Sequence, residues 1–247
     1  MPESDEKTGR LVLEALIAFA AATLLAAALF QVARVVPIVA DNLQALIAVV
    51  FIYVPVLIAR RRNLDLSAFG FGYRPIGRAL AFGVGGPLIA FPLFLVGFVL
   101  FYQVVCSRPD LGFIAPVGWC RRFIGWAGLA HPRPPADFLT AAFTQVVVVA
   151  LPEELFFRGY LLARLEKALP PRRRLLGGGV GRALVLAALL FALGHVLVDF
   201  DPRRLATFFP GLLFGWMRSA TGSIAAGVVA HASANLYIDA LQRTFFQ

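Results

Sequence analysis

Residues 11–33 read LVLEALIAFAAATLLAAALFQVA, an apolar run of 23 residues interrupted by a single carboxylate. A helix needs about 20 apolar residues to cross the hydrocarbon core of a bilayer, so this run is long enough to span a membrane. Its position near the N-terminus also fits a signal peptide, but it lacks a clean cleavage site. We therefore interpret it as the first transmembrane helix.

Further apolar segments of similar character follow along the chain. Across all 247 residues, 60% are hydrophobic and 15% are charged, whereas a soluble domain carries roughly 25% charged residues. The sequence predicts an all-α fold, a polytopic transmembrane helical bundle of about seven spans, with residues 1–247 forming a single membrane domain. Besides 11–33, the predicted spans are 43–59, 79–102, 137–163, 182–199, 204–218 and 222–242.

The net charge of +9 comes from short arginine runs between the apolar segments, such as Arg60–Arg62 and Arg172–Arg174. Such runs are typical of loops that face anionic lipid and do not indicate nucleic-acid binding. If the N-terminus is cytoplasmic, the cytoplasmic segments hold fourteen basic residues and the outer segments hold eight. We therefore expect a cytoplasmic N-terminus. Heavy use of Ala, Leu, Gly and Arg, with two lysines, indicates a GC-rich bacterial genome and hence the bacterial cytoplasmic (inner) membrane.

Both cysteines, Cys106 and Cys120, lie in the polar segment 103–136 between two predicted spans. They are either two unrelated thiols or a disulfide formed in an oxidising compartment. The expected orientation places this segment outside, where a disulfide would persist.

The fourth predicted span carries charged side chains in its middle, in VALPEELFFRG at residues 149–159. An ionisable residue inside lipid costs at least ~2.5–3.5 kcal/mol, so it is a candidate for function. Glu154 and Arg158 are four residues apart, with the acid first, which favours a helical ion pair. That pair could also serve only to hold helices together. Glu153 has no such partner in its own helix and is the better candidate for a general base.

Two other predicted spans carry isolated polar residues. His195 follows LLFALG in the fifth, and His231 and Asn235 lie four residues apart in the seventh. Each set alone fits a satisfied core histidine or a seam of interhelical hydrogen bonds. Together with Glu153 they supply the groups needed to hydrolyse an amide without a covalent nucleophile. A carboxylate and an imidazole can deprotonate a water, and a second His and an Asn amide can donate to the oxyanion.

Other intramembrane chemistries fit less well. The sequence contains no His-Glu-x-x-His zinc motif and no Gly-x-Gly-Asp motif. Ser223 and Ser233 are not in a nucleophile-elbow context, so a serine mechanism is poorly supported. We expect no cofactor. Zinc is not excluded, because Glu153, His195 and His231 could supply three ligands and leave one position open.

The motif set resembles the three motifs of the CPBP family, which contains the CAAX prenyl endopeptidases and bacteriocin-processing and self-immunity proteins. The resemblance covers roughly residues 137–242, the predicted motif-bearing catalytic core. The matching residues, in order and on separate predicted spans, are Glu153-Glu154-x-x-x-Arg158, Phe191-x-x-x-His195 and His231-x-x-x-Asn235.

The resemblance implies an intramembrane endopeptidase of the glutamic type, formerly regarded as a metalloprotease. Glu153 and His195 would hold and activate the water. His231 and Asn235 would form the oxyanion site. Glu154 and Arg158 would support these groups.

The implied partners are the lipid bilayer and a membrane-anchored protein or peptide substrate, with no nucleic acid. The chain is also similar to a narrower bacterial branch, sometimes called myxosortases. That branch cuts C-terminal sorting tags, each a short motif followed by a transmembrane helix and a basic tail. The alternative is a non-catalytic immunity, scaffold or transport protein that uses the same polar pocket for binding. The presence of both Glu153 and His195 favours the enzyme.

Overall fold

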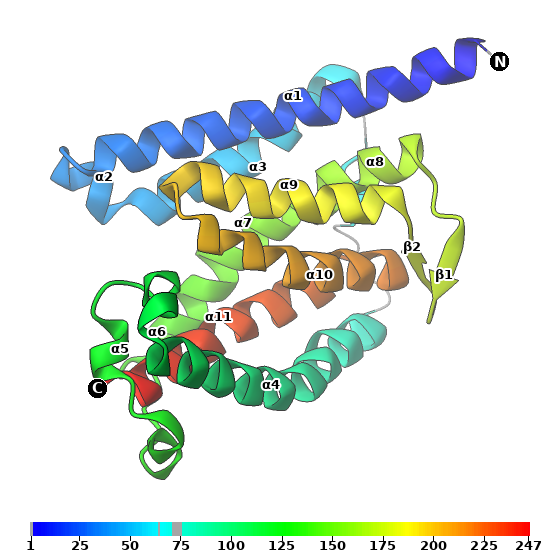
Figure 1. The fold of residues 1–247 in the computed structure, drawn as a ribbon. Coiled ribbons are helices and arrows are strands. Elements are labelled where there is room, and N and C mark those ends of the chain that lie inside the picture. The colour runs from blue at the N-terminus through cyan, green and yellow to red at the C-terminus, as the bar shows by residue number, and fades with distance from the viewer. Residues whose placement is uncertain (1, 64, 71–75) are drawn as a thin grey trace.

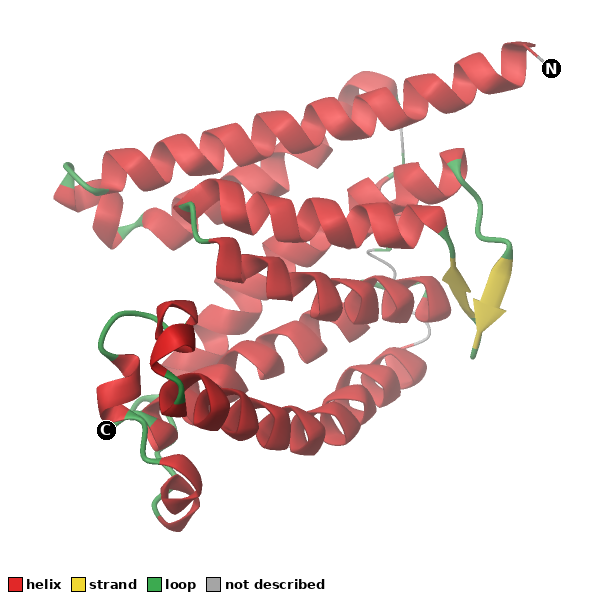
Figure 2. Ribbon diagram, viewed as in Figure 1, coloured by secondary structure: helices red, strands yellow, loops and turns green. Residues whose placement is uncertain are grey.

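The computed structural model describes residues 2–63, 65–70 and 76–247, and 82% of the protein is helical. The predicted all-α membrane bundle is thereby confirmed (Figures 1 and 2). The α-helices of the described residues are α1 Pro2–Ala33, α2 Pro37–Asp41, α3 Leu43–Arg62, α4 Ile76–Ser107, α5 Trp119–Arg122, α6 Phe138–Phe143, α7 Leu151–Glu154, α8 Ala163–Ala168, α9 Arg182–Asp199, α10 Phe208–Thr221 and α11 Ala225–Phe245.

Shorter elements connect or interrupt these helices. The 3₁₀ turns are η1 Leu66–Phe69, η2 Pro109–Ile114, η3 Gly125–Ala130 and η6 Pro202–Thr207. Two π-helical stretches are η4 Thr144–Ala150 and η5 Leu155–Leu162. The strands β1 Arg173–Leu175 and β2 Gly178–Val180 pair antiparallel in one small hairpin.

Four helices of the described chain are long and apolar enough to cross a membrane: Thr8–Ala33, Leu43–Arg62, Ile76–Ser107 and Arg182–Asp199. The other three predicted spans are helical as well, as the continuous run 138–168, α10 and α11. The 14 residues of α10 measure about 21 Å at ~1.5 Å per residue. This is shorter than the ~30 Å hydrocarbon core, so α10 does not reach across it by itself.

The motif-bearing helices lie between two outer helices, α1 on one side and α4 on the other (Figure 1). One apolar core joins α1, α3 and α9 to η5 through buried residues such as Phe51, Phe156 and Phe191. A second core, which includes Ala79 and Ala226, packs α4 against α10 and α11. Burial of these apolar faces inside the bundle fixes the positions of the polar residues on the inner helices.

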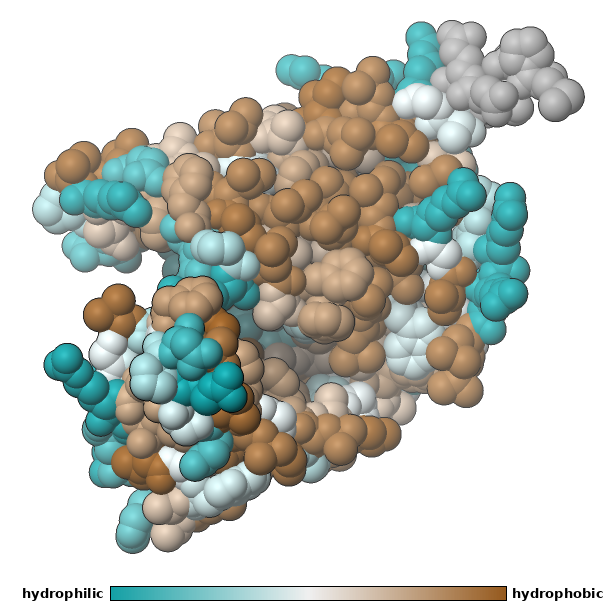
Figure 3. Space-filling model, viewed as in Figure 1, coloured by the Kyte–Doolittle hydropathy of each residue, from teal (hydrophilic) through white to brown (hydrophobic). Residues whose placement is uncertain are grey.

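The outer surface of the bundle is apolar. On α4, Leu88, Ile89 and Leu93 are each about 70% exposed, and hydrophobic side chains cover most of the face shown in Figure 3. Exposed apolar side chains on a long helix are explained by contact with lipid.

The start of α10 differs from the prediction. We expected a span from residue 204, but the helix begins at Phe208. The preceding residues form η6, where the Asp201 carboxylate accepts hydrogen bonds from the Arg203 backbone and guanidinium. These bonds hold the pKa of the Asp201 carboxyl below its usual value. Arg204 pairs with Asp199 at 2.9 Å instead of joining α10.

The polar segment after α4 is attached to the bundle at two places. Cys106 in α4 and Cys120 in α5 form a disulfide, with Cα atoms 5.0 Å apart. Further on, the Ile124 N–H donates to the Phe245 carbonyl at 3.0 Å. The segment is therefore held against the C-terminal end of α11.

Candidate active site

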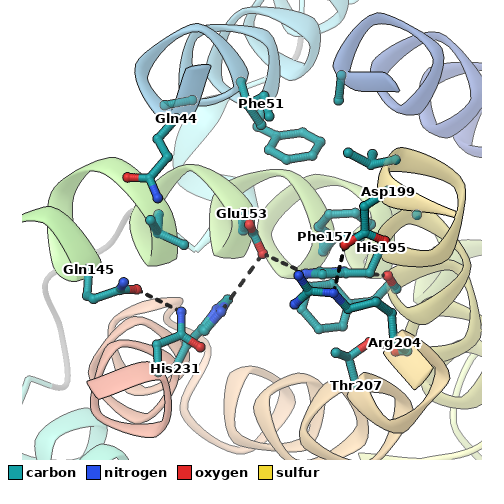
Figure 4. A pocket seen from close by; sticks show the side chains of 18 of the residues that line it. Gln44, Phe51, Gln145, Glu153, Phe157, His195, Asp199, Arg204, Thr207 and His231 are labelled. Atoms are coloured by element: carbon teal, nitrogen blue, oxygen red, sulfur yellow. Dashed lines mark hydrogen bonds and ion pairs between the residues drawn. The ribbon is translucent and has the colours of Figure 1, made fainter. Parts of the chain in front are cut away.

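A cavity of about 500 Å³ lies between α1, α3, α9, α10, α11 and the run 138–168. Glu153, His195, His231 and Asn235 all line it, and Figure 4 shows Glu153 between the two imidazoles. Three membrane helices far apart in the sequence thus contribute to one polar pocket. Further polar lining residues are Gln44, Gln145, Asp199, Arg204, Thr207, Asp239 and Gln242.

The two adjacent glutamates point in different directions. The Glu153 side chain faces the cavity and is 15% exposed, whereas Glu154 is fully buried. They lie in the short α-helical stretch Leu151–Glu154, with π-helical turns on both sides. Pro152 has no N–H to donate, and π-turns within helices are frequent at functional sites. The wide turns place both carboxylates at the centre of the bundle.

Glu153 has a buried oxygen between two imidazoles. Its Oε2 lies 3.8 Å from His195 Nε2 and 3.9 Å from His231 Nε2. This oxygen has no hydrogen-bond partner among the described residues. Both distances exceed the ~2.6–3.2 Å of a direct hydrogen bond. A water molecule beside the three atoms could contact all of them.

The orientation of His195 is fixed by its own helix. Nδ1 lies 2.9 Å from the Phe191 carbonyl oxygen, one turn earlier. A carbonyl oxygen only accepts hydrogen bonds, so Nδ1 carries the proton. In the neutral imidazole, Nε2 is then an acceptor and faces Glu153. The Phe191 ring packs against the imidazole, with centroids 4.5 Å apart.

Glu154 joins Arg158 and His231 in a buried cluster. Its Oε1 lies 2.8 Å from Arg158 Nη1 and 3.0 Å from His231 Nδ1. The predicted helical pairing of Glu154 with Arg158 is therefore present, and His231 is a further partner that sequence reasoning missed. The Arg158 guanidinium also lies over the Phe191 ring, 4.0 Å from its centroid. The charges are compensated even though Arg158 and Glu154 are removed from solvent.

Gly227 allows α11 to approach this cluster. A Cβ at residue 227 would lie 2.5 Å from Glu154 Oε2 and 3.1 Å from its Cδ. No side chain fits at such a distance, so only glycine permits this contact. The close approach brings His231, one turn further along α11, to Glu154.

Asn235 has a partner that sequence reasoning also missed. Its Nδ2 donates to Gln145 Oε1 at 2.8 Å, across 90 residues of sequence. The sequence offered one signal for this contact. Gln145 is an isolated amide directly before the apolar stretch VVVVAL at residues 146–151. Asp239, which continues the face of His231 and Asn235, lines the cavity and pairs with Arg243 at 2.9 Å.

The sequence did not exclude a zinc site with Glu153, His195 and His231 as its ligands. Within the described residues, no group of three or more His, Cys, Asp or Glu is arranged to hold a metal ion. The same three side chains are arranged around the position for a water molecule described above.

The family model described as type II CAAX prenyl endopeptidase Rce1-like matches residues 135–237. This range includes every motif residue of the cavity. No curated protein and no solved structure matches the chain. The match agrees with the resemblance seen in the motifs, and it supports the CPBP family for the motif-bearing residues 135–237.

Proposed function

We propose that this protein hydrolyses a peptide bond in a membrane-anchored substrate, using water activated by Glu153 and His195. The observation that carries the proposal is the buried, unpartnered Glu153 Oε2 within 4 Å of two imidazole Nε2 atoms. A carboxylate in this position can take a proton from a water held by His195. The similarity of residues 135–237 to a protease family supports the same reaction.

The reaction would proceed in two stages. The water oxygen attacks the carbonyl carbon while Glu153 Oε2 takes one proton. The tetrahedral intermediate then collapses, the C–N bond breaks, and Glu153 returns the proton to the leaving nitrogen. The products are a carboxylic acid and an amine, which exchange the remaining proton to become a carboxylate and an ammonium, and no covalent enzyme intermediate is formed.

The oxyanion would be stabilised by His231 and Asn235. Glu154 holds Nδ1 of His231, so Nε2 of the same ring faces the cavity, where an Nε2–H would donate to the oxyanion. Asn235 uses one N–H on Gln145 and keeps the second for the substrate. Donors of this kind are effective when they are oriented before the reaction starts. Glu154 and Arg158 act as positioning residues.

The proposed substrate is a C-terminal sorting tag, composed of a short motif, a transmembrane helix and a basic tail. Such a tag would bring its scissile bond to the protein by lateral diffusion in the bilayer. The test begins with proteins whose C-termini become longer in a deletion strain. Each is placed with the purified protein in proteoliposomes, and the products are identified by mass spectrometry.

We expect one new carboxyl terminus per substrate, and unchanged activity after treatment with a strong chelator. Loss of activity on chelation, restored by zinc, would keep the protease and replace its mechanism. Absence of cleavage of every such substrate would favour the non-catalytic immunity, scaffold or transport protein.

A further inference from the structure

We propose that the cavity opens to the exoplasmic side of the membrane, so that its substrates are segments exposed on that side. The nature of the substrate rests on the proposed function, whereas the side to which the cavity opens does not. It depends on which end of the bundle carries the cavity mouth, and on which end faces the cytoplasm.

The bundle has two ends that differ in their elements (Figure 1). The disulfide end carries α2, α5, the turn between α9 and α10, and the C-terminus. The hairpin end carries the N-terminal part of α1, α8 and the β1–β2 hairpin.

The cavity is lined by residues near those helix termini that lie at the disulfide end. Phe30 is close to the end of α1, Gln44 to the start of α3, and Gln242 to the end of α11. Asp199 is the last residue of α9, and Arg204 lies in the turn that follows. The space-filling view is hollowed at this end, and the hollow contains hydrophilic side chains (Figure 3).

On the hairpin side of Glu153, the helix is packed into the core. Phe156, Tyr160, Leu161 and Leu162 are all fully buried. Buried aromatic and aliphatic side chains leave no room for water or a peptide. The reacting water therefore reaches Glu153 from the disulfide end.

Two independent features assign the ends to membrane sides. Within the described residues, the segments of the hairpin end hold thirteen Lys and Arg residues and those of the disulfide end hold eight, and Arg74 lies outside the described residues. The positive-inside rule makes the hairpin end cytoplasmic. The disulfide between Cys106 and Cys120 lies at the opposite end, where an oxidising compartment would preserve it.

The charged side chains at the cavity mouth are paired with one another. Arg204 pairs with Asp199 and Arg243 pairs with Asp239, each at 2.9 Å. The mouth therefore presents compensated ion pairs beside the Gln44 amide and the Thr207 hydroxyl. Amides and hydroxyls match the donors and acceptors of a peptide backbone.

The substrate topology follows from this orientation. A transmembrane anchor with a basic cytoplasmic flank exposes its other flank on the exoplasmic side. A tag in which the motif precedes the helix and the basic tail follows it has this arrangement. A segment exposed only in the cytoplasm would meet the packed hairpin end and remain uncut.

The orientation can be tested by cysteine labelling in membrane vesicles. Gln44→Cys and Thr207→Cys place a thiol at the mouth, and Arg173→Cys places one on the exposed hairpin. The protein has two native cysteines and both are bonded, so the wild type without reductant serves as the unlabelled control. A membrane-impermeant maleimide is applied to right-side-out and to inverted vesicles.

We expect both mouth cysteines to react in right-side-out vesicles and the hairpin cysteine to react in inverted vesicles. Mouth cysteines that react in inverted vesicles, or only after solubilisation in detergent, would overturn the inference. The measurement requires no catalysis, so it stands even if the protein cuts nothing. In a second arm, the same cleavable segment is displayed on either side of the membrane. Cleavage of the cytoplasmic version would contradict the inference, whereas failure of both would contradict only the proposed function.

Discussion

The Nδ1 atom of His231 lies 3.0 Å from Oε1 of Glu154, although 77 residues separate them in the sequence. The same carboxylate oxygen also contacts Arg158, so three side chains from two helices share one buried interaction. This cluster lies directly behind the cavity. It determines how the His231 ring faces Glu153, and it contains two charges that stabilise each other.

Glu154→Ala should destabilise the protein strongly. Arg158 would remain buried without its carboxylate, and breaking a buried pair by removing one partner typically costs ~3–5 kcal/mol. The matched control is Asp110→Ala, which removes an exposed partner of Arg108 and should cost less than ~1 kcal/mol. Denaturant unfolding in detergent micelles measures both. Equal stability of the two variants would show that the cluster does not hold the helices together.

Gly227→Ala should disrupt the same cluster through packing. The added methyl group would overlap Glu154 and push α11 away, so both stability and turnover should fall. Overpacking of this kind costs typically ~1–3 kcal/mol. The control is Gly97→Ala in α4, where nothing lies within 4 Å of the added Cβ. A Gly227→Ala protein with wild-type stability and activity would contradict the close approach.

Asn235→Ala should lower turnover by on the order of 10²–10³, as expected for one oxyanion donor. Gln145→Ala should cost less, because the Asn235 amide remains but is no longer oriented. If Gln145 acts through Asn235, the double variant should be no slower than Asn235→Ala alone. Cleavage rates of one membrane-anchored substrate under single-turnover conditions test this. Additive losses would assign Gln145 a role independent of Asn235.

Much of the fold and of the motif set could be predicted from the sequence. The boundaries of α9 agree with the predicted span 182–199, because the apolar run there is bounded by Arg182 and Asp199. Glu154 and Arg158 were paired correctly because a helix brings residues four apart together. Periodicity of this kind is local, and it fixes contacts only within one helix.

Contacts between helices could not be obtained in the same way. The partners of Glu154 and Asn235 on other helices, His231 and Gln145, depend on how the helices pack. The start of α10 was placed too early because the pairing of Arg204 with Asp199, which keeps Arg204 in the preceding turn, is a side-chain contact that an apolar run does not reveal. The fully buried position of Glu154 likewise depends on Gly227 in a distant segment.

The most direct test of the account is turnover by Glu153→Gln in proteoliposomes that contain a cleavable membrane-anchored substrate. Glutamine keeps the shape of glutamate and loses the base, so turnover should fall by at least ~10²–10⁴ while folding is retained. Glu166→Gln is the control, since Glu166 is similarly exposed at 17% but pairs with Arg218 outside the cavity. It should cleave at the wild-type rate. Full activity of Glu153→Gln would contradict the proposal that Glu153 activates the water.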